Sequence, residues 1–98
     1  MHTIYTTETF DHWYKSLRDR QAARRIQARI DRAEDGNLGD CKPVGEGESE
    51  MRIHYGQGYR VYFIERGFEI VILLAGGDKG TQAKDIKWAQ HLARQFTE

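Results

Sequence analysis

The stretch that most constrains this chain is residues 50–66, EMRIHYGQGYRVYFIER. Apolar or aromatic side chains alternate with polar ones on both sides of Gly56-Gln57-Gly58, and this period of two is typical of half-buried strands. The two glycines permit the positive φ angles that a tight reversal needs. The segment therefore predicts a β-hairpin with one apolar and one polar face.

With Gln57 at the tip, we expect four cross-strand pairs: Tyr55–Tyr59, His54–Arg60, Ile53–Val61 and Arg52–Tyr62. The core face would then hold Met51, Ile53, Tyr55, Tyr59, Val61 and Phe63. The polar face would hold Arg52, His54, Arg60 and Tyr62. Opposed side chains lie roughly 5 Å apart at Cβ, and this face lacks the mixed-sign pairs of an ordinary exposed sheet. Its composition suits a phosphodiester ligand better than a core, although the pattern alone favours a solvated outer face.

Two helices are expected before the hairpin, after a short β-prone opening at residues 2–6. Thr6 or Thr7 can cap the first helix, whose apolar stripe is Phe10, Trp13, Tyr14 and Leu17. Asp19 can cap the second, which runs to about Asp35 and ends at Gly36. Its buried stripe is Ala22, Ala23, Ile26, Ile30 and Ala33. Residues 37–49 are turn-rich and predict an ordered loop, with at most a very short strand at residues 42–44.

A strand over residues 68–75, FEIVILLA, is apolar enough to be covered on both faces. A reversal at Arg66-Gly67 that pairs Glu65 with Phe68 places three side chains on the core face: Ile70, Ile72 and Leu74. Val71 and Leu73 then share a face with Arg60, and a last helix from Thr81 would cover them. The fold class is α+β, in the order β-α-α-β-β-β-α, with a small antiparallel sheet packed against two N-terminal helices in one domain, residues 1–98.

Two further groups of residues are candidates for anion binding. Residues 76–80, GGDKG, join a buried strand to a helix, and we expect Lys79 to reach the site of Arg60 and His54. The spacing is not that of a P-loop. Arginines crowd the second helix, including Arg25 and Arg29; a solvated helix face explains them best, and a track for RNA or an acidic partner is the alternative.

The bulk composition excludes several classes of protein. There is no apolar run long enough to span a bilayer and no signal peptide, so we expect a soluble chain without a membrane partner. The single Cys41 excludes an internal disulfide and fits a reducing cytoplasm. No spacing of histidines or cysteines predicts a metal site. The net charge is near zero, which gives no global argument for nucleic acid, although the arginines are clustered.

Two segments, SEMRIHYGQGYRVYF and VILLAGGDKGTQAKDIKWA, resemble the addiction-module killer proteins of the RelE/ParE toxin superfamily, specifically the HigB-like branch. The loop LGDCKPVGEG and the order of elements are similar to the same family. The resemblance implies a bacterial type II toxin in the cytoplasm, neutralised by an antitoxin, which we expect to be a small helix-turn-helix protein. It also implies a metal-independent endoribonuclease that needs no cofactor and cleaves messenger RNA on the ribosome.

Under this resemblance, Arg52, His54, Arg60 and Lys79 match basic positions of the family. We expect His54 to act as general base or acid, and Arg60 and Arg52 to hold the scissile phosphate with help from Lys79. Tyr62 would stack on a base or donate a proton, and Arg25 and Arg29 are expected RNA contacts. Two alternatives stay open: a ParE-like inhibitor of DNA gyrase without nuclease activity, and an inactive domain that only binds the antitoxin.

Overall fold

A five-stranded mixed sheet forms the centre of the structure, a computed structural model that describes residues 2–96. Its strands, in chain order, are β1 (Thr3–Thr6), β2 (Cys41–Gly45), β3 (Glu48–Ile53), β4 (Tyr59–Arg66) and β5 (Ile70–Gly77). They lie in the order β1-β5-β4-β3-β2. The α+β class is as expected. The all-antiparallel sheet is wrong, because β1 pairs in parallel with β5, and the strand expected at residues 42–44 is the longer β2.

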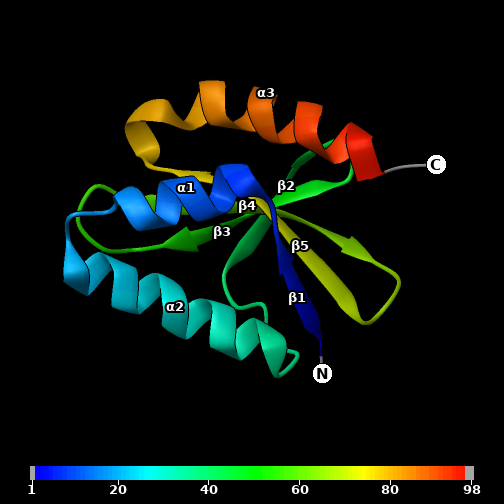
Figure 1. Ribbon diagram of the computed structural model, residues 1–98, viewed down its shortest axis with the longest axis horizontal. Helices are drawn as coiled ribbons and strands as arrows, with labels where there is room; N and C mark the ends of the chain where they lie inside the picture. The colour runs from blue at the N-terminus through cyan, green and yellow to red at the C-terminus, as the bar shows by residue number, and fades with distance from the viewer. Residues whose placement is uncertain (1, 97–98) are drawn as a thin grey trace.

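Three α-helices cover the two faces of this sheet: α1 (Glu8–Ser16), α2 (Arg20–Glu34) and α3 (Gln82–Ala93). Short 3₁₀ turns flank α3, namely η1 (Lys79–Thr81) and η2 (Arg94–Phe96). Figure 1 shows α2 and α3 on opposite sides of the sheet. The side chains of α1 and α2 share one core cluster, and those of α3 belong to the other. None of the helices among residues 2–96 is long and apolar enough to cross a lipid bilayer.

The first two helices begin where their capping residues predict. The Thr7 hydroxyl accepts a hydrogen bond from the Phe10 amide at 3.0 Å, and the Asp19 carboxylate accepts from the amides of Gln21 and Ala22. These bonds satisfy backbone donors that an uncapped first turn leaves open. Gly36 follows α2 with a φ of 99°, a conformation that suits glycine. Local chemistry therefore decides both helix starts and the end of α2.

The β3–β4 hairpin has the expected faces but a different register. Arg52 pairs with Arg60, and Glu50 pairs with Tyr62. The expected His54–Arg60 pair is wrong, because the turn takes up residues 54–58 and the Gly58 amide donates to the Tyr55 carbonyl at 3.0 Å. The displacement is two residues, and an even displacement leaves each side chain on its expected face.

Along residues 63–66 the pairing of β4 with β5 differs from the expected register by three residues, and this odd displacement exchanges two sets of side chains. A β-bulge between Tyr62 and Phe63 makes the difference four residues for the rest of β4. Glu65 pairs with Val71 rather than with Phe68, because residues 67–69 form the loop and Phe68 is 94% exposed. Val71 and Leu73 therefore pack with α1 and α2, in the core cluster that also contains Met51, Ile53, Val61 and Phe63. The expectation that the last helix covers Val71 and Leu73 is therefore wrong, because α3 packs on Tyr62, Ile64, Ile72, Leu74 and Ala75.

Candidate functional site

One open cavity of about 510 Å³ is lined by all four of the residues expected to carry the chemistry: Arg52, His54, Arg60 and Lys79. We call it the cationic cavity. Its remaining lining is the turn of the β3–β4 hairpin, residues 55–58. The residues come from β3, the following turn, β4 and η1. Two separate segments of the chain, the β3–β4 hairpin and η1, therefore bring their positive charge to one end of the sheet.

The sheet register explains how Lys79 arrives there. Arg60 pairs with Gly77, the last residue of β5, so the chain leaves the sheet beside Arg60. The Lys79 amide then lies 3.4 Å from the Gln57 carbonyl oxygen, to which it donates a hydrogen bond. The Asp78 carboxylate caps η1 by accepting from the amides of Gly80 and Thr81. The expected approach of Lys79 to Arg60 and His54 is thus present, although through a different strand pairing.

A buried acidic residue, Glu50, lies next to this cavity, and the interpretation of the polar face as purely cationic is wrong. Glu50 is 2% exposed. Its Oε1 lies 3.7 Å from Nε of Arg52, and its Oε2 accepts a hydrogen bond from Nε2 of Gln82 at 2.9 Å. The alternation of β3 places Glu50 on the face of Arg52 and Arg60, so this signal was present in the sequence. Glu50 gives Arg52 a fixed counter-charge.

Tyr62 has no face open to a ligand. It is fully buried between the sheet and α3, at 0% exposure. Burial, reinforced by the charges of Glu50 and Asp85, raises the pKa of its hydroxyl, which opposes proton release. Neither the expected stacking on a nucleobase nor the expected proton donation fits this position, because a ligand in the cavity cannot reach a fully buried side chain.

Arg60 is only partly exposed, and its Nε is a buried donor. Among the described residues, the Nε atoms of Arg52 and Arg60 and the Tyr62 hydroxyl are buried without a hydrogen-bond partner. Both side chains also line the cationic cavity, where their guanidinium groups can bind a ligand. An oxyanion is the class of ligand that suits them, because arginine matches carboxylate and phosphate geometry.

His54 is paired with an acid that sequence reasoning missed. Its Nε2 lies 2.5 Å from Oδ2 of Asp40. The hydrogen bond from His54, followed by the positive charges of Arg52 and Arg29, lowers the pKa of the Asp40 carboxyl. Asp40 precedes β2 in the turn-rich segment, and no spacing rule links it to His54. The contact exists only because the β2–β3 pairing folds this segment back.

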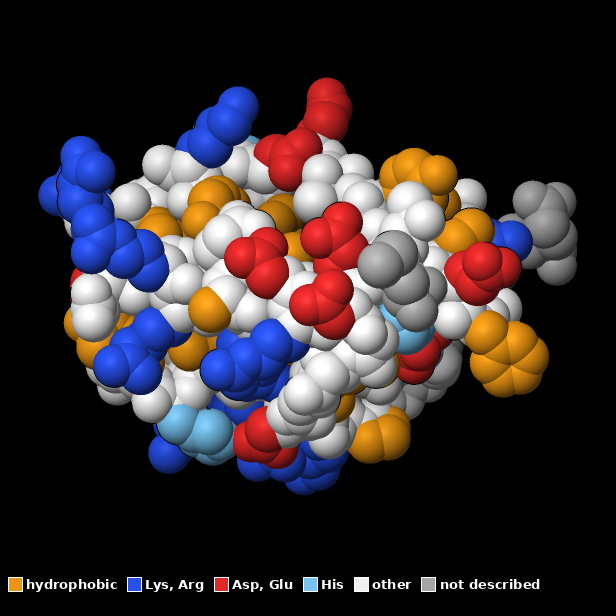
Figure 2. All heavy atoms as spheres, turned by 90° about the horizontal axis from the view of Figure 1, so that it is seen from below, with side chains coloured by type: hydrophobic (Ala, Val, Ile, Leu, Met, Phe, Trp, Pro, Cys, Tyr) orange, Lys and Arg blue, Asp and Glu red, His pale blue; other side chains and the backbone are white. Residues whose placement is uncertain are grey.

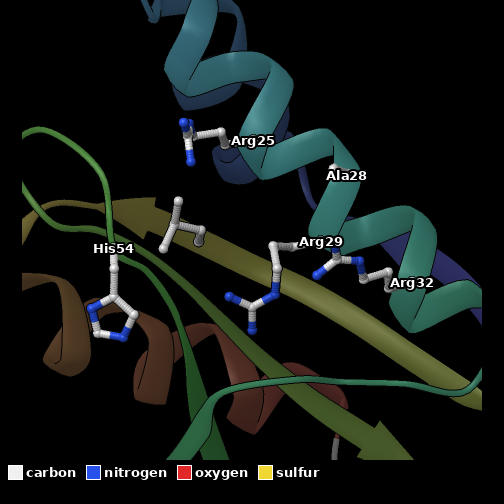
Figure 3. A pocket seen from close by; sticks show the side chains of 6 residues that line it. Arg25, Ala28, Arg29, Arg32 and His54 are labelled. Carbon is white, nitrogen blue, oxygen red and sulfur yellow. The ribbon is translucent and has the colours of Figure 1, made fainter.

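A second, smaller cavity of about 270 Å³ adjoins the first at His54. Arg25, Arg29 and Arg32 line it at i, i+4 and i+7 of α2 (Figure 3). The Arg25 guanidinium lies 4.7 Å from the centre of the Tyr55 ring, in a cation–π contact. Figure 2 shows the face of the molecule that is seen from below Figure 1. Basic side chains gather on one part of that face beside a histidine, and acidic side chains lie nearer its centre. The neutral total charge thus conceals a local basic surface.

Arg29 differs from its neighbours, because its guanidinium is used inside the protein. It donates to the backbone carbonyl oxygens of Arg52, Leu38 and Asp40. Figure 3 shows its side chain reaching from α2 toward the sheet. Arg25 is the better placed of the two expected RNA contacts, whereas Arg29 holds the segment that carries Asp40.

These features define an α+β protein with an open cationic cavity at one end of a five-stranded mixed sheet. The chain is 52% identical over 93 residues to an uncharacterized protein of Haemophilus influenzae, and the match covers 95% of this chain and 94% of that protein. The chain belongs to the same family as that Haemophilus protein. No family model matches the chain, and no solved structure matches it.

Proposed function

We propose that this protein is the toxin of a bacterial type II toxin–antitoxin system and acts as a metal-independent endoribonuclease on messenger RNA. The observation that carries the proposal is the cationic cavity, in which Arg52, Arg60 and Lys79 surround an open space edged by His54. Three cations suit a phosphodiester, and an imidazole suits proton transfer near neutral pH. The resemblance of residues 49–63 and 71–89 to HigB-like members of the RelE/ParE superfamily supports the same proposal.

The chemistry proposed is attack by the ribose 2′-hydroxyl on the adjacent phosphorus. His54 takes the proton of the 2′-hydroxyl as general base, while the new 2′-oxygen–phosphorus bond forms. The bond from phosphorus to the 5′-oxygen breaks, and that oxygen leaves with a proton from solvent. Arg60 and Arg52 bind the phosphate oxygens as their negative charge increases, and Lys79 adds a third positive charge. The products are a 2′,3′-cyclic phosphate and a 5′-hydroxyl.

The two cavities together suggest a path for the RNA strand. His54 lines both of them, so a strand whose scissile phosphate lies on Arg60 can continue past His54 toward α2. There Arg25 is exposed and can meet the next phosphate. We propose Arg25 as an RNA contact that adds affinity without base selectivity.

Incubation of the purified protein with messenger RNA, with and without ribosomes, tests the proposal. We expect cleavage products that end in a 2′,3′-cyclic phosphate, and we expect EDTA to leave the rate of the ribosome-free reaction unchanged. Loss of ribosome-free cleavage in EDTA would reject the metal-free chemistry. Intact RNA together with inhibited DNA gyrase would favour the gyrase-inhibitor alternative. An expressed chain that harms neither target and is not toxic would be an inactive antitoxin-binding domain.

The antitoxin is part of the same proposal. We expect a small helix-turn-helix protein that covers either the arginine-bearing face of α2 or the basic face of the hairpin with an acidic or apolar segment. Co-expression of the neighbouring reading frame, followed by co-purification, tests this partner.

A further inference from the structure

The segment that carries Asp40 is fixed in place from two sides. Arg29 of α2 donates from Nη2 to the carbonyl oxygens of Leu38 and Asp40, at 3.1 and 3.2 Å. From the sheet, the Arg52 amide donates to the same Asp40 carbonyl at 3.0 Å. Arg29 also donates from Nη1 to the Arg52 carbonyl. The backbone of Asp40 is therefore tied both to α2 and to the strand that leads to His54.

Gly39 allows this arrangement. Its φ is +70°, and a Cβ at this position would lie 2.7 Å from Nη2 of Arg29. A side chain here would meet both the strain of a positive φ and the guanidinium group. Glycine therefore lets Arg29 lie against the backbone on which Asp40 depends.

The Asp40 carboxylate faces His54, and basic side chains line the cavities on both sides of this pair. Arg52, Arg60 and Lys79 lie on the side of the cationic cavity. On the side of α2 lie Arg25, Arg29 and Arg32. None of the described residues that line these two cavities is acidic. The His54 side chain is 70% exposed, so packing does little to hold its ring, and the Asp40 contact at 2.5 Å fixes its orientation.

We infer that Asp40, held by Arg29 and Gly39, is a positioning residue for His54. The carboxylate accepts a hydrogen bond from the protonated Nε2, which leaves Nδ1 as the ring nitrogen that takes the proton of the substrate 2′-hydroxyl. The ring then carries a positive charge beside an ionised Asp40, and the carboxylate stabilises that cation without itself becoming protonated. The inference rests on the proposed ribonuclease function.

The first test compares RNA cleavage by the wild type, Asp40→Asn and Glu69→Gln. Glu69 is an exposed acid in the loop at the opposite end of the β4–β5 hairpin, so its variant loses the same charge far from His54. We expect D40N to lose on the order of 10-fold to 100-fold in kcat, part of the factor that a positioned base supplies, with KM nearly unchanged. E69Q should match the wild type. Wild-type kcat in D40N would overturn the inference and leave the proposed function standing.

The second test needs no cleavage. Titration of the Asp40 carboxyl by carbon NMR should give a lowered pKa in the wild type and a higher pKa in His54→Ala, because the His54 hydrogen bond is the largest cause of the lowering. An unchanged Asp40 pKa in H54A would show that the two side chains do not interact in solution. If the pair interacts but the wild type cleaves no RNA, the proposed function fails and the inference fails with it.

Gly39→Ala and Gly67→Ala form a matched pair for the support behind Asp40. Both glycines have a positive φ, +70° and +65°, but a Cβ at Gly67 would have nothing within 4 Å. We expect G39A to raise the Asp40 pKa and to lower kcat, and G67A to leave both at their wild-type values. Equal behaviour of the two variants would show that the Arg29 contact does not position Asp40.

Discussion

Replacing Tyr62 by phenylalanine should make the protein more stable, which is the opposite of what most core substitutions do. Its hydroxyl is buried, and within the described chain it has no hydrogen-bond partner. A buried polar group without a partner costs about 1–3 kcal/mol. Phenylalanine keeps the ring and its packing against Ile64, Leu74 and α3. We expect Y62F to raise the free energy of unfolding by about 1 kcal/mol, at the lower end of this range.

Tyr14→Phe is the matched control. The Tyr14 hydroxyl donates to the Ala23 carbonyl at 3.2 Å and links α1 to α2. Loss of that bond should cost about 1 kcal/mol. Thermal unfolding followed by circular dichroism should therefore move the two midpoints in opposite directions, by about 4–8 °C per kcal/mol for a domain of this size. A lower midpoint for Y62F would refute the reasoning, because the Tyr62 hydroxyl would then have a partner in solution, with Glu50 the nearest acid by sheet pairing.

Three further predictions concern the core, the pH dependence of stability and the RNA path. Gly76→Ala should lower the free energy of unfolding by about 1–3 kcal/mol in urea denaturation, since a Cβ would lie 2.2 Å from the Trp13 ring; wild-type stability would mean that the ring moves aside freely. Burial raises the pKa of Glu48 above its ordinary value of 4.5, so the folded state binds this proton more tightly than the unfolded chain does. The free energy of unfolding should therefore fall as the pH rises from about 4.5 through the raised pKa. Glu48→Gln should remove this part of the pH dependence, as measured by denaturation across this range. An identical pH dependence in both proteins would contradict the burial argument. Arg25→Ala should weaken RNA binding at low salt and reduce, by about one, the slope of the logarithm of the binding constant against the logarithm of the salt concentration. Arg24→Ala is an exposed control that lines neither cavity, and it should change neither quantity. Equal losses would show that the overall charge of α2 binds RNA rather than Arg25 itself.

The sequence predicted the helices and the faces of the hairpin because local rules govern them. Thr7 and Asp19 cap the first two helices through bonds that span only two or three residues. The alternation around Gly56 and Gly58 gives each strand two distinct faces, and the two-residue displacement of the pairing left each side chain on its expected face. These features need no knowledge of the distant chain.

Register was the part that periodicity could not decide. The loop after Arg66 closes with three residues rather than the tight reversal expected, because Gly67 adopts a φ of 65° and Phe68 points into solvent. That one difference moves Val71 and Leu73 to the other face of β5. Alternation was uninformative there, since residues 70–75 are apolar on both faces.

The acids of the site were missed for a related reason. Glu50 and Asp40 lie in a stretch rich in acidic residues, and the sequence gives no distance from either of them to Arg52 or His54. Glu50 reaches the site by strand alternation, and Asp40 reaches it through the β2–β3 pairing and the Arg29 contacts. The Asp40 contact depends on the assembled sheet and left no pattern in the sequence, whereas the alternation of β3 already placed Glu50 on the face of Arg52.

The most direct test of the central claim is the rate at which Arg60→Ala cleaves RNA compared with the wild type, with the far-side variant Glu69→Gln as control. Loss of one preorganised cation from the phosphate site should slow cleavage by a factor of about 10²–10³, while circular dichroism shows both variants folded and E69Q cleaves at the wild-type rate. Cleavage by R60A at the wild-type rate would contradict the account, because the cavity at the end of the sheet would then not be where the phosphodiester is cut.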